Sequence, residues 1–288
     1  MQKLEKLKQK LSTFMKTLLS LMTAALLFMG CSSQAKQDSE ETAKKVLVLY
    51  YSQTGATKTV AEEIQKQLDA DIASIEIENP YDGDFQQTIA RCQDEKANGI
   101  LPKVKPFEVN IEDYDIIFLG YPIWFGSYAP PVEALLKDND FSGKEIVPFC
   151  TFGSGGLNTS TDALKAALPN ATIHEGYGVR NARLSAAPAE VERFLIENGY
   201  KKGEVAPLPD YSAQKDVSDK EIAIFNEACA DYQFPLGTPV SFGSRITENS
   251  TDYKFVAASK GPDGAESTST IFVTVVKGAK AEFTQVVR

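Results

Sequence analysis

The feature that most constrains the fold is a short apolar run that ends abruptly in a loop of hydroxyl side chains. Residues 45–51 read Lys-Val-Leu-Val-Leu-Tyr-Tyr, a continuous apolar stretch of the kind that parallel sheets bury on both faces. After the loop, apolar residues recur on one helical face: Val60, Ala61, Ile64 and Leu68. The sequence therefore predicts a buried strand, a polar loop and an amphipathic helix, in that order.

The loop between this strand and helix is suited to hold an anion. It consists of Ser52, Gln53, Thr54, Gly55, Ala56 and Thr57. Free backbone N–H groups and the positive end of the helix dipole converge there. The hydroxyls can donate to phosphate oxygens, and Gly55 lets the backbone approach closely. We expect a single phosphomonoester in this loop, with a plain helix cap as the alternative.

Two other phosphate-binding loops do not fit these residues. A Walker A loop requires a glycine directly before its lysine, and Thr57 stands at that position before Lys58. The dinucleotide-binding fingerprint requires three spaced glycines, and only Gly55 is present. Nucleotide triphosphates and dinucleotides are therefore not the expected ligands.

The next part of the chain alternates between strand-like and helix-like segments. Strands are expected at 72–78, 114–120, 145–151 and 172–177, and helices at 85–98, 130–137, 157–168 and 189–197. Five strands alternating with helices predict an α/β fold with a doubly wound parallel sheet. Ligands of such sheets bind beyond the carboxyl ends of the strands, near the change in strand order. The loops after the first, third and fourth strands are therefore the candidate site.

The loop after the third strand carries an aromatic cluster. Its candidate residues are Pro122, Ile123, Trp124, Phe125 and Gly126. Trp124 is the only tryptophan in the sequence. A large apolar cluster on a loop suits the face of a flat ring system. The alternative is that the aromatic side chains close off the hydrophobic core.

The loop after the fourth strand is rich in glycine. Its candidate residues are Thr151, Phe152, Gly153, Ser154, Gly155 and Gly156. The glycines allow backbone N–H groups to approach the polar edge of a ring, although a connector without ligand contacts is also consistent with them. A nucleophile elbow around Ser154 is not supported, because Phe152 stands where that motif requires glycine.

Together the three loops resemble those of the flavodoxin family over about residues 45–200. The Ser-x-Thr-Gly-x-Thr pattern is similar to its FMN-phosphate loop, segment 115–131 to its second flavin loop and 151–156 to its third. The resemblance implies a flavodoxin-like doubly wound five-stranded parallel sheet that binds FMN. It also implies electron transfer with a redox partner protein or a small electron acceptor. An FMN-dependent NAD(P)H:quinone-type oxidoreductase and a non-redox binding module on the same fold remain as alternatives.

The N-terminal residues predict export and a lipid anchor. Five lysines precede an apolar run at 18–29 that ends in Gly30 and Cys31, in the order of a signal peptide over residues 1–30. The run is too short for a membrane span, which needs about twenty residues. Phe28-Met29-Gly30-Cys31 resembles the lipobox of bacterial lipoproteins, which implies lipidation at Cys31 and a membrane-anchored lipoprotein of the bacterial cell envelope. Residues 31–44 are polar and read as a tether.

Charge and cysteine content exclude several classes of function. Removing residues 1–30 removes five lysines and one glutamate, which takes the formal charge from −9 to −13 and argues against nucleic-acid binding. Cys92, Cys150 and Cys229 are widely spaced and show no disulfide framework. A lone histidine, His174, and the lack of a close cysteine pair argue against a zinc site. The acidic composition, without Arg or Lys near the ring, predicts a low reduction potential for the flavin.

The last third of the sequence predicts a second, smaller domain. The flavodoxin-like FMN-binding domain is expected to span 45–202, followed by a Pro- and Ser-rich linker at 203–220. Residues 221–288 are expected to form a small α+β domain, a helix at 221–230 against an antiparallel sheet. Its strands are expected at 239–242, 252–259, 268–276 and 282–287. This domain is loosely similar to cystatin-like folds, and partner docking or stabilisation is its expected role.

Overall fold

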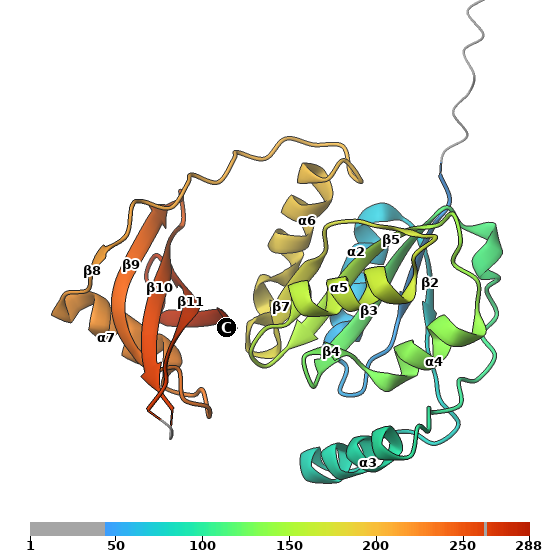
Figure 1. The fold of residues 1–288 in the computed structure, drawn as a ribbon. Helices are drawn as coiled ribbons and strands as arrows, with labels where there is room; N and C mark the ends of the chain where they lie inside the picture. The colour runs from blue at the N-terminus through green and yellow to red at the C-terminus, as the bar shows by residue number, and fades with distance from the viewer. Residues whose placement is uncertain (1–43, 262–263) are drawn as a thin grey trace, which may run out of the picture. The chain divides into compact units, whose positions relative to one another are not determined.

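The computed structural model describes residues 44–261 and 264–288. The expected signal peptide, the lipidation site Cys31 and the tether up to residue 43 lie outside these residues. The part of the chain that the structure describes contains two β-sheets, the first packed with several helices and the second with one (Figure 1). In this part, no helix has the length and apolar character needed to span a membrane.

The first sheet is parallel and doubly wound, as expected for a flavodoxin-like fold. Its strands are β1 (Val46–Tyr50), β2 (Asp71–Ser74), β3 (Ile116–Trp124), β5 (Glu145–Phe152), β6 (Thr172–Ile173) and β7 (Tyr177–Arg180). The order across the sheet is β2-β1-β3-β5, with β6 and β7 both pairing with the outer side of β5. The chain moves from β1 to one side for β2 and to the other side for β3. The topological switch therefore lies between β1 and β3, and the predicted α/β fold class is confirmed.

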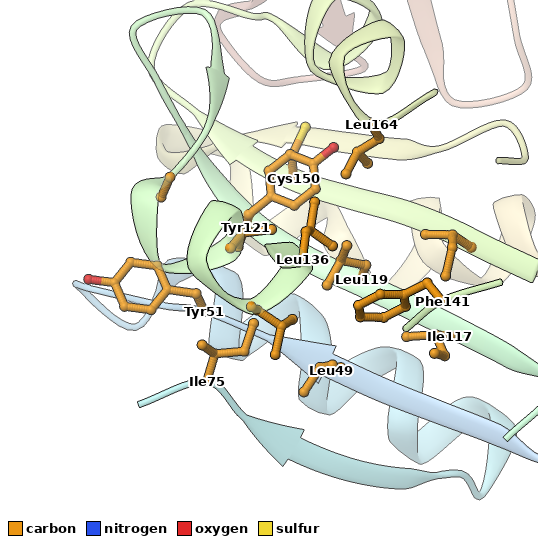
Figure 2. Packing of buried hydrophobic residues seen from close by; sticks show 14 of the residues in the cluster. Leu49, Tyr51, Ile75, Ile117, Leu119, Tyr121, Leu136, Phe141, Cys150 and Leu164 are labelled. Atoms are coloured by element: carbon orange, nitrogen blue, oxygen red, sulfur yellow. The ribbon is translucent and has the colours of Figure 1, made fainter. Parts of the chain in front are cut away.

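Helices cover both faces of this sheet, because successive residues of each strand point to opposite sides. The helices are α2 (Ala56–Leu68), α3 (Phe85–Ala97), α4 (Pro130–Asp138), α5 (Leu157–Ala167) and α6 (Ala187–Glu197), with short 3₁₀ turns η1 (Ile111–Asp113) and η2 (Asn181–Ala186). Val48 of β1 packs under α2 and α6. Leu49 packs on the opposite face, in a cluster that includes Leu136 of α4 and Leu164 of α5 (Figure 2).

The third strand continues further than its sequence pattern suggests. β3 extends four residues past Gly120, because Tyr121 and Pro122 still pair with β5, and Ile123 and Trp124 pair with the chain as it folds back. The chain then folds back at Phe125 and Gly126 into β4 (Ser127–Tyr128), which pairs antiparallel with the end of β3. The expected aromatic loop is therefore a tight hairpin. Burial and pairing with a neighbouring strand decide where a strand ends, and neither can be read from local sequence.

The fifth strand position is filled by two short pieces, β6 and β7, where a single strand was expected at 172–177. Between the pieces, Val147 and Pro148 of β5 face three residues, 174–176. Pro148 has no N–H group to donate, and a Cβ on Gly176 would lie 2.6 Å from the Pro148 carbonyl oxygen. The strand therefore bulges around the proline and resumes its pairing at Tyr177.

The second sheet is antiparallel and contains five strands in the order β12-β11-β10-β9-β8. These are β8 (Lys215–Asp216), β9 (Thr238–Ile246), β10 (Ser250–Lys260), β11 (Glu266–Val276) and β12 (Ala281–Val287). Helix α7 (Asp219–Cys229) packs on the sheet, with the Phe225 and Phe255 rings 5.4 Å apart in its core. The predicted helix-plus-antiparallel-sheet layout is confirmed. β8 was not anticipated, since it lies within the polar segment interpreted as a linker.

Candidate functional site

The three candidate loops meet at one edge of the parallel sheet. They follow β1, β3 and β5, which are neighbours in the sheet, so their carboxyl ends lie side by side. Two contacts join them directly. The hydroxyl oxygens of Thr57 and Thr151 are 2.9 Å apart, and a Cβ on Gly156 would lie 2.8 Å from a methyl carbon of Ile123. The sequence-predicted site residues are thus brought together as expected for a doubly wound sheet.

The N-terminus of α2 is open at the centre of this edge. Gly55 occupies the cap position with a φ of 92°, and no side chain of the described residues caps the helix. In contrast, α3 carries a capping box built from Asp84 and Gln87. The first N–H groups of any helix lack partners within that helix. In α2 these N–H donors and the positive end of the helix dipole are available to bind an anion.

The hydroxyls around this helix end differ in what they contact. Ser52 accepts a hydrogen bond from the Gly55 backbone N–H at 3.2 Å, which shapes the turn. Thr54 is exposed at the tip of the loop. Thr57 is 1% exposed, and its hydroxyl faces Thr151. Thr54 is therefore the hydroxyl most accessible to a ligand, whereas Thr57 fastens the first loop to the third.

Gln53 also holds the loop in place. Its side-chain amide donates to the Tyr81 carbonyl oxygen at 2.9 Å and to the Thr88 hydroxyl at 3.0 Å. These partners lie after β2, so the first loop is anchored to the segment that crosses the sheet edge beside it. The predicted cofactor-binding role of Gln53 can then involve only its backbone or the carboxamide oxygen.

The aromatic hairpin presents two very different side chains. Phe125 has a φ of 50° and is 59% exposed. Trp124 is half-buried, with its ring edge-on to Tyr81 at 5.1 Å and to Tyr51 at 6.0 Å between centroids. Trp124 therefore packs on the core, as the alternative interpretation of this cluster holds. Phe125 is the aromatic ring that faces solvent at the turn.

Tyr81 packs beside the hairpin, against the Trp124 ring. Its hydroxyl donates to Glu95 at 2.5 Å, and the Arg91 guanidinium lies 4.0 Å above its ring. Burial, followed by the bond to Glu95, raises the pKa of Tyr81, which stays a neutral donor. Arg91 is held in turn by Glu95 at 2.8 Å. This group of residues orders the segment after β2 against Trp124.

The third loop begins inside the sheet and ends in glycines. Thr151 and Phe152 belong to β5 and are buried, whereas Gly153 is exposed. The Arg180 side chain donates from Nε to the Gly153 carbonyl oxygen at 2.8 Å. Burial lowers the pKa of Arg180. A cation therefore lies against the third loop, through a contact between residues 27 positions apart that the local sequence does not show.

The comparison with known families settles what kind of domain carries these loops. The sequence pattern of the flavodoxin family matches residues 45–193, more than half of the chain. This chain belongs to the flavodoxin family. The matched segment starts one residue before β1 and ends inside α6, so the flavodoxin domain contains all three candidate loops.

Several solved flavoproteins are similar to the flavodoxin domain. A putative flavoprotein from Bacteroides eggerthii is 29% identical, with 50% of this chain and 94% of that chain covered and a TM-score of 0.44. One from Bacteroides uniformis is 24% identical, covers 52% and 98%, and has a TM-score of 0.47. A flavoprotein from Lactobacillus acidophilus, solved in complex with FMN, is 24% identical, covers 52% and 98%, and has a TM-score of 0.45. No curated protein matches the chain.

Residues outside the sequence-predicted set also shape the site of this flavodoxin-family protein. Arg180 contacts the third loop from β7, and Tyr232 and Val286 reach Ser154 from residues beyond the flavodoxin domain. Nothing in the local sequence marks these three, because each is far from the loops along the chain. Among the described residues, no group of His, Cys, Asp and Glu is arranged to hold a metal ion.

Proposed function

We propose that the flavodoxin domain binds one FMN at the edge formed by the three loops and transfers electrons through it. The observation that carries the proposal is the open, glycine-capped N-terminus of α2, with Ser52 and Thr54 beside it. Family membership supports FMN as the cofactor, and the similar Lactobacillus acidophilus flavoprotein was solved with FMN. The phosphate is assigned to α2 and the isoalloxazine ring to the space between the hairpin and the third loop.

The residues of this edge fit that assignment sterically. A Cβ placed on Gly55, Gly126 or Gly153 would meet no atom within 4 Å, so each loop offers backbone next to open space. Gly55 lets the phosphate approach the helix end, and Gly153 lets the ring edge approach the third loop. Phe125 is exposed at the hairpin tip, where it can cover one face of the ring.

Bound FMN supplies one- and two-electron redox chemistry, and the protein tunes it through the groups around the ring. The N–H groups of α2 balance the phosphate charge without a salt bridge. Arg180, next to Gly153, favours added negative charge on a neighbouring ring, whereas the net acidic chain opposes it. We propose that the resulting carrier exchanges electrons with a redox partner protein or a small acceptor.

The test is the visible spectrum and bound-nucleotide mass of the purified chain, followed by titration of apoprotein with FMN and with riboflavin. Thr54→Ala is expected to weaken FMN binding about ten- to hundredfold, the loss of one hydrogen bond to a charged group. Riboflavin affinity should not change, because riboflavin has no phosphate. Thr172→Ala, an exposed threonine at the opposite end of the sheet, is the matched control. Apoprotein that binds neither compound would refute the proposal.

We also propose that the protein is exported and anchored through Cys31. The support is the order of basic segment, apolar run and Gly30-Cys31 in the sequence. Radiolabelled palmitate should be incorporated into the chain and not into Cys31→Ser. Label in both variants, or in neither, would contradict this assignment.

The NAD(P)H-dependent reductase is the alternative to an electron carrier. Oxidation of NADH by the purified yellow protein would favour this alternative.

A further inference from the structure

The polar atoms of Ser154 in the third loop are engaged by the C-terminal domain. The Tyr232 hydroxyl donates to the Ser154 hydroxyl at 2.7 Å, and the Val286 backbone N–H donates to the Ser154 carbonyl oxygen at 2.9 Å. Tyr232 follows α7, and Val286 lies in β12. Two separate elements of the C-terminal domain therefore hold one residue of the loop.

Gly153, the residue before Ser154, is held by Arg180 of β7, which also contacts the C-terminal domain. Arg180 donates from Nε to the Gly153 carbonyl oxygen at 2.8 Å and from Nη1 to the Phe283 carbonyl oxygen at 3.3 Å. Its guanidinium carbon lies 4.5 Å from the centre of the Phe283 ring. Arg180 thus bridges the loop and β12 with one planar group.

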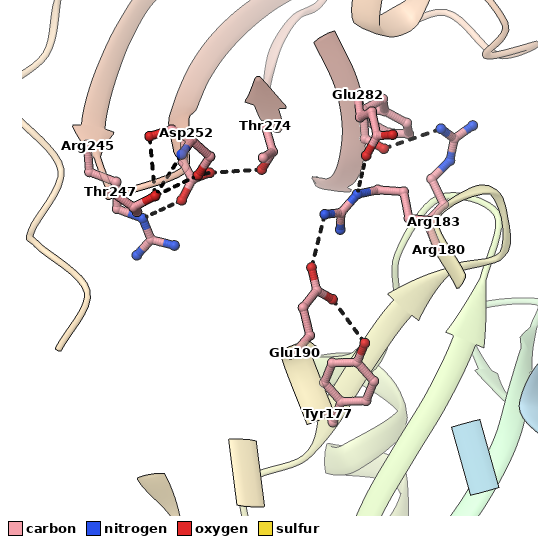
Figure 3. Close-up of polar contacts among 11 residues, drawn as sticks. Tyr177, Arg180, Arg183, Glu190, Arg245, Thr247, Asp252, Thr274 and Glu282 are labelled. Carbon is pink, nitrogen blue, oxygen red and sulfur yellow. Dashed lines mark hydrogen bonds and ion pairs between the residues drawn. The ribbon is translucent and has the colours of Figure 1, made fainter. Parts of the chain in front are cut away.

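An ion pair stabilises the same junction. The Arg183 guanidinium contacts Glu282 of β12 at 3.2 Å and Glu190 of α6 at 2.9 Å, while Glu190 accepts from the Tyr177 hydroxyl (Figure 3). The Arg183 side chain is 11% exposed, whereas Glu282 is 48% exposed, so only the arginine end of this pair is shielded from solvent. The junction between β12 and the end of β7 is therefore built from charged groups that are mutually paired.

Gly155 shows how closely the two parts approach. A Cβ at this position would lie 2.7 Å from the Val286 carbonyl oxygen, which is backbone and cannot rotate away. Any side chain here would push β12 from the loop. The glycine that looks like a source of flexibility in the sequence is therefore a close-packing residue.

We propose that the C-terminal domain positions the third loop for the isoalloxazine ring, with Tyr232 and Val286 as positioning residues that act through Ser154. A loop with three glycines in four residues has many conformations, and ordering it costs binding free energy. The contacts to Ser154, Gly153 and Gly155 fix the loop before the cofactor arrives. This inference rests on the proposed FMN function, and it assigns Ser154 to an anchor that does not itself touch the flavin.

The deciding experiment is a double-mutant cycle of Tyr232→Phe and Ser154→Ala in the full chain, read by FMN and riboflavin affinity. Each single variant should weaken both ligands by the same factor, about three- to tenfold, because the ring side of the site is loosened. The double variant should lose no more than either single variant. Tyr253→Phe, in the same domain without a loop contact, is the control and should bind like wild type. Additive losses would overturn the anchor role, because they mean that Ser154 touches the flavin directly.

Amide hydrogen exchange of residues 153–156 in the cofactor-free chain tests the anchor without FMN. The amides of these residues should be protected in wild type and exchange about tenfold faster in Tyr232→Phe and in Gly155→Ala. The reduction potential of bound FMN should shift in both variants and stay unchanged in Tyr253→Phe. Equal exchange in all variants would refute the inference, even if FMN binds. Protection that depends on Tyr232 in a chain that binds no flavin would refute the proposed function and retain the anchor.

Discussion

The hydroxyl oxygen of Thr57 in the first turn of α2 lies 2.9 Å from that of Thr151 at the end of β5. Both side chains are 1% exposed. The sequence predicts Thr57 as a phosphate ligand, yet its hydroxyl is the direct link between the first and third loops. The pair sets the distance between the proposed phosphate end and the ring end of the site.

A valine double-mutant cycle measures this link. Thr57→Val and Thr151→Val should each lower the free energy of unfolding by about 1–3 kcal/mol, because each leaves a buried hydroxyl without its partner. The double variant should cost less than the sum, since it removes both polar groups. Trp124 is the only tryptophan, so its fluorescence during urea unfolding reports on the flavodoxin domain. Additive costs would show that the two hydroxyls have other partners in solution.

Gly55 should be required for FMN beyond its effect on stability. Gly55→Ala places a side chain at a φ of 92° in open space, so the expected cost is strain of about 1–2 kcal/mol. Gly143→Ala is the matched control, with a φ of 75° and open space at the amino end of β5. Both should lower the urea midpoint similarly, and only Gly55→Ala should weaken FMN in a titration. Equal FMN affinity in the two variants would place the phosphate elsewhere.

Phe125 is expected to lower the stability of the apoprotein and to strengthen FMN binding. It is strained at a φ of 50° and 59% exposed, so the apoprotein gains little from its packing. Phe125→Asn is expected to stabilise the apoprotein by about 0.5–1 kcal/mol, because asparagine tolerates this backbone conformation. The same variant should weaken FMN binding if Phe125 covers the ring. A variant that is more stable and binds FMN as tightly would show that Phe125 does not cover the ring.

The thiols of the described residues should be unreactive at neutral pH. Burial raises the pKa of Cys229 to about 11, and it also raises the pKa values of Cys92 and Cys150. A raised thiol pKa means that the neutral form persists as pH rises toward 11, so little thiolate exists at pH 7.5. Labelling with iodoacetamide should be at least tenfold slower in the native chain than in urea and should accelerate above pH 10. Fast stoichiometric labelling at pH 7.5 would contradict this.

The same raised pKa has a consequence for stability. Since the Cys229 pKa is higher in the folded state than its usual value of 9.0, folding favours the protonated thiol. This contribution is fully present below pH 9 and is lost as pH rises to about 11. Cys229→Ala should therefore flatten the alkaline fall in the urea midpoint over that range, while its neutral-pH stability changes through packing alone.

Local sequence was sufficient to predict the fold class and to indicate the three candidate loops that the fold brings together. The run before Ser52 predicts a strand buried on both faces, and the hydroxyls and glycine that follow predict an anion site at a helix end. These properties depend on residues within a few positions of one another. The helix-and-sheet layout of the C-terminal domain could be predicted for the same reason, from helical periodicity and turn residues.

Contacts between distant residues decided the rest. The end of β3 at Trp124 depends on pairing first with β5 and then with β4, and the break before Tyr177 depends on Pro148 in a neighbouring strand. The anchoring of Ser154 by Tyr232 joins residues 78 positions apart. Sequence determines which segments form strands, helices and turns, because these depend on neighbouring residues. Only the tertiary structure decides which side chains of the loops are left for a ligand, since long-range packing uses some of the same polar groups.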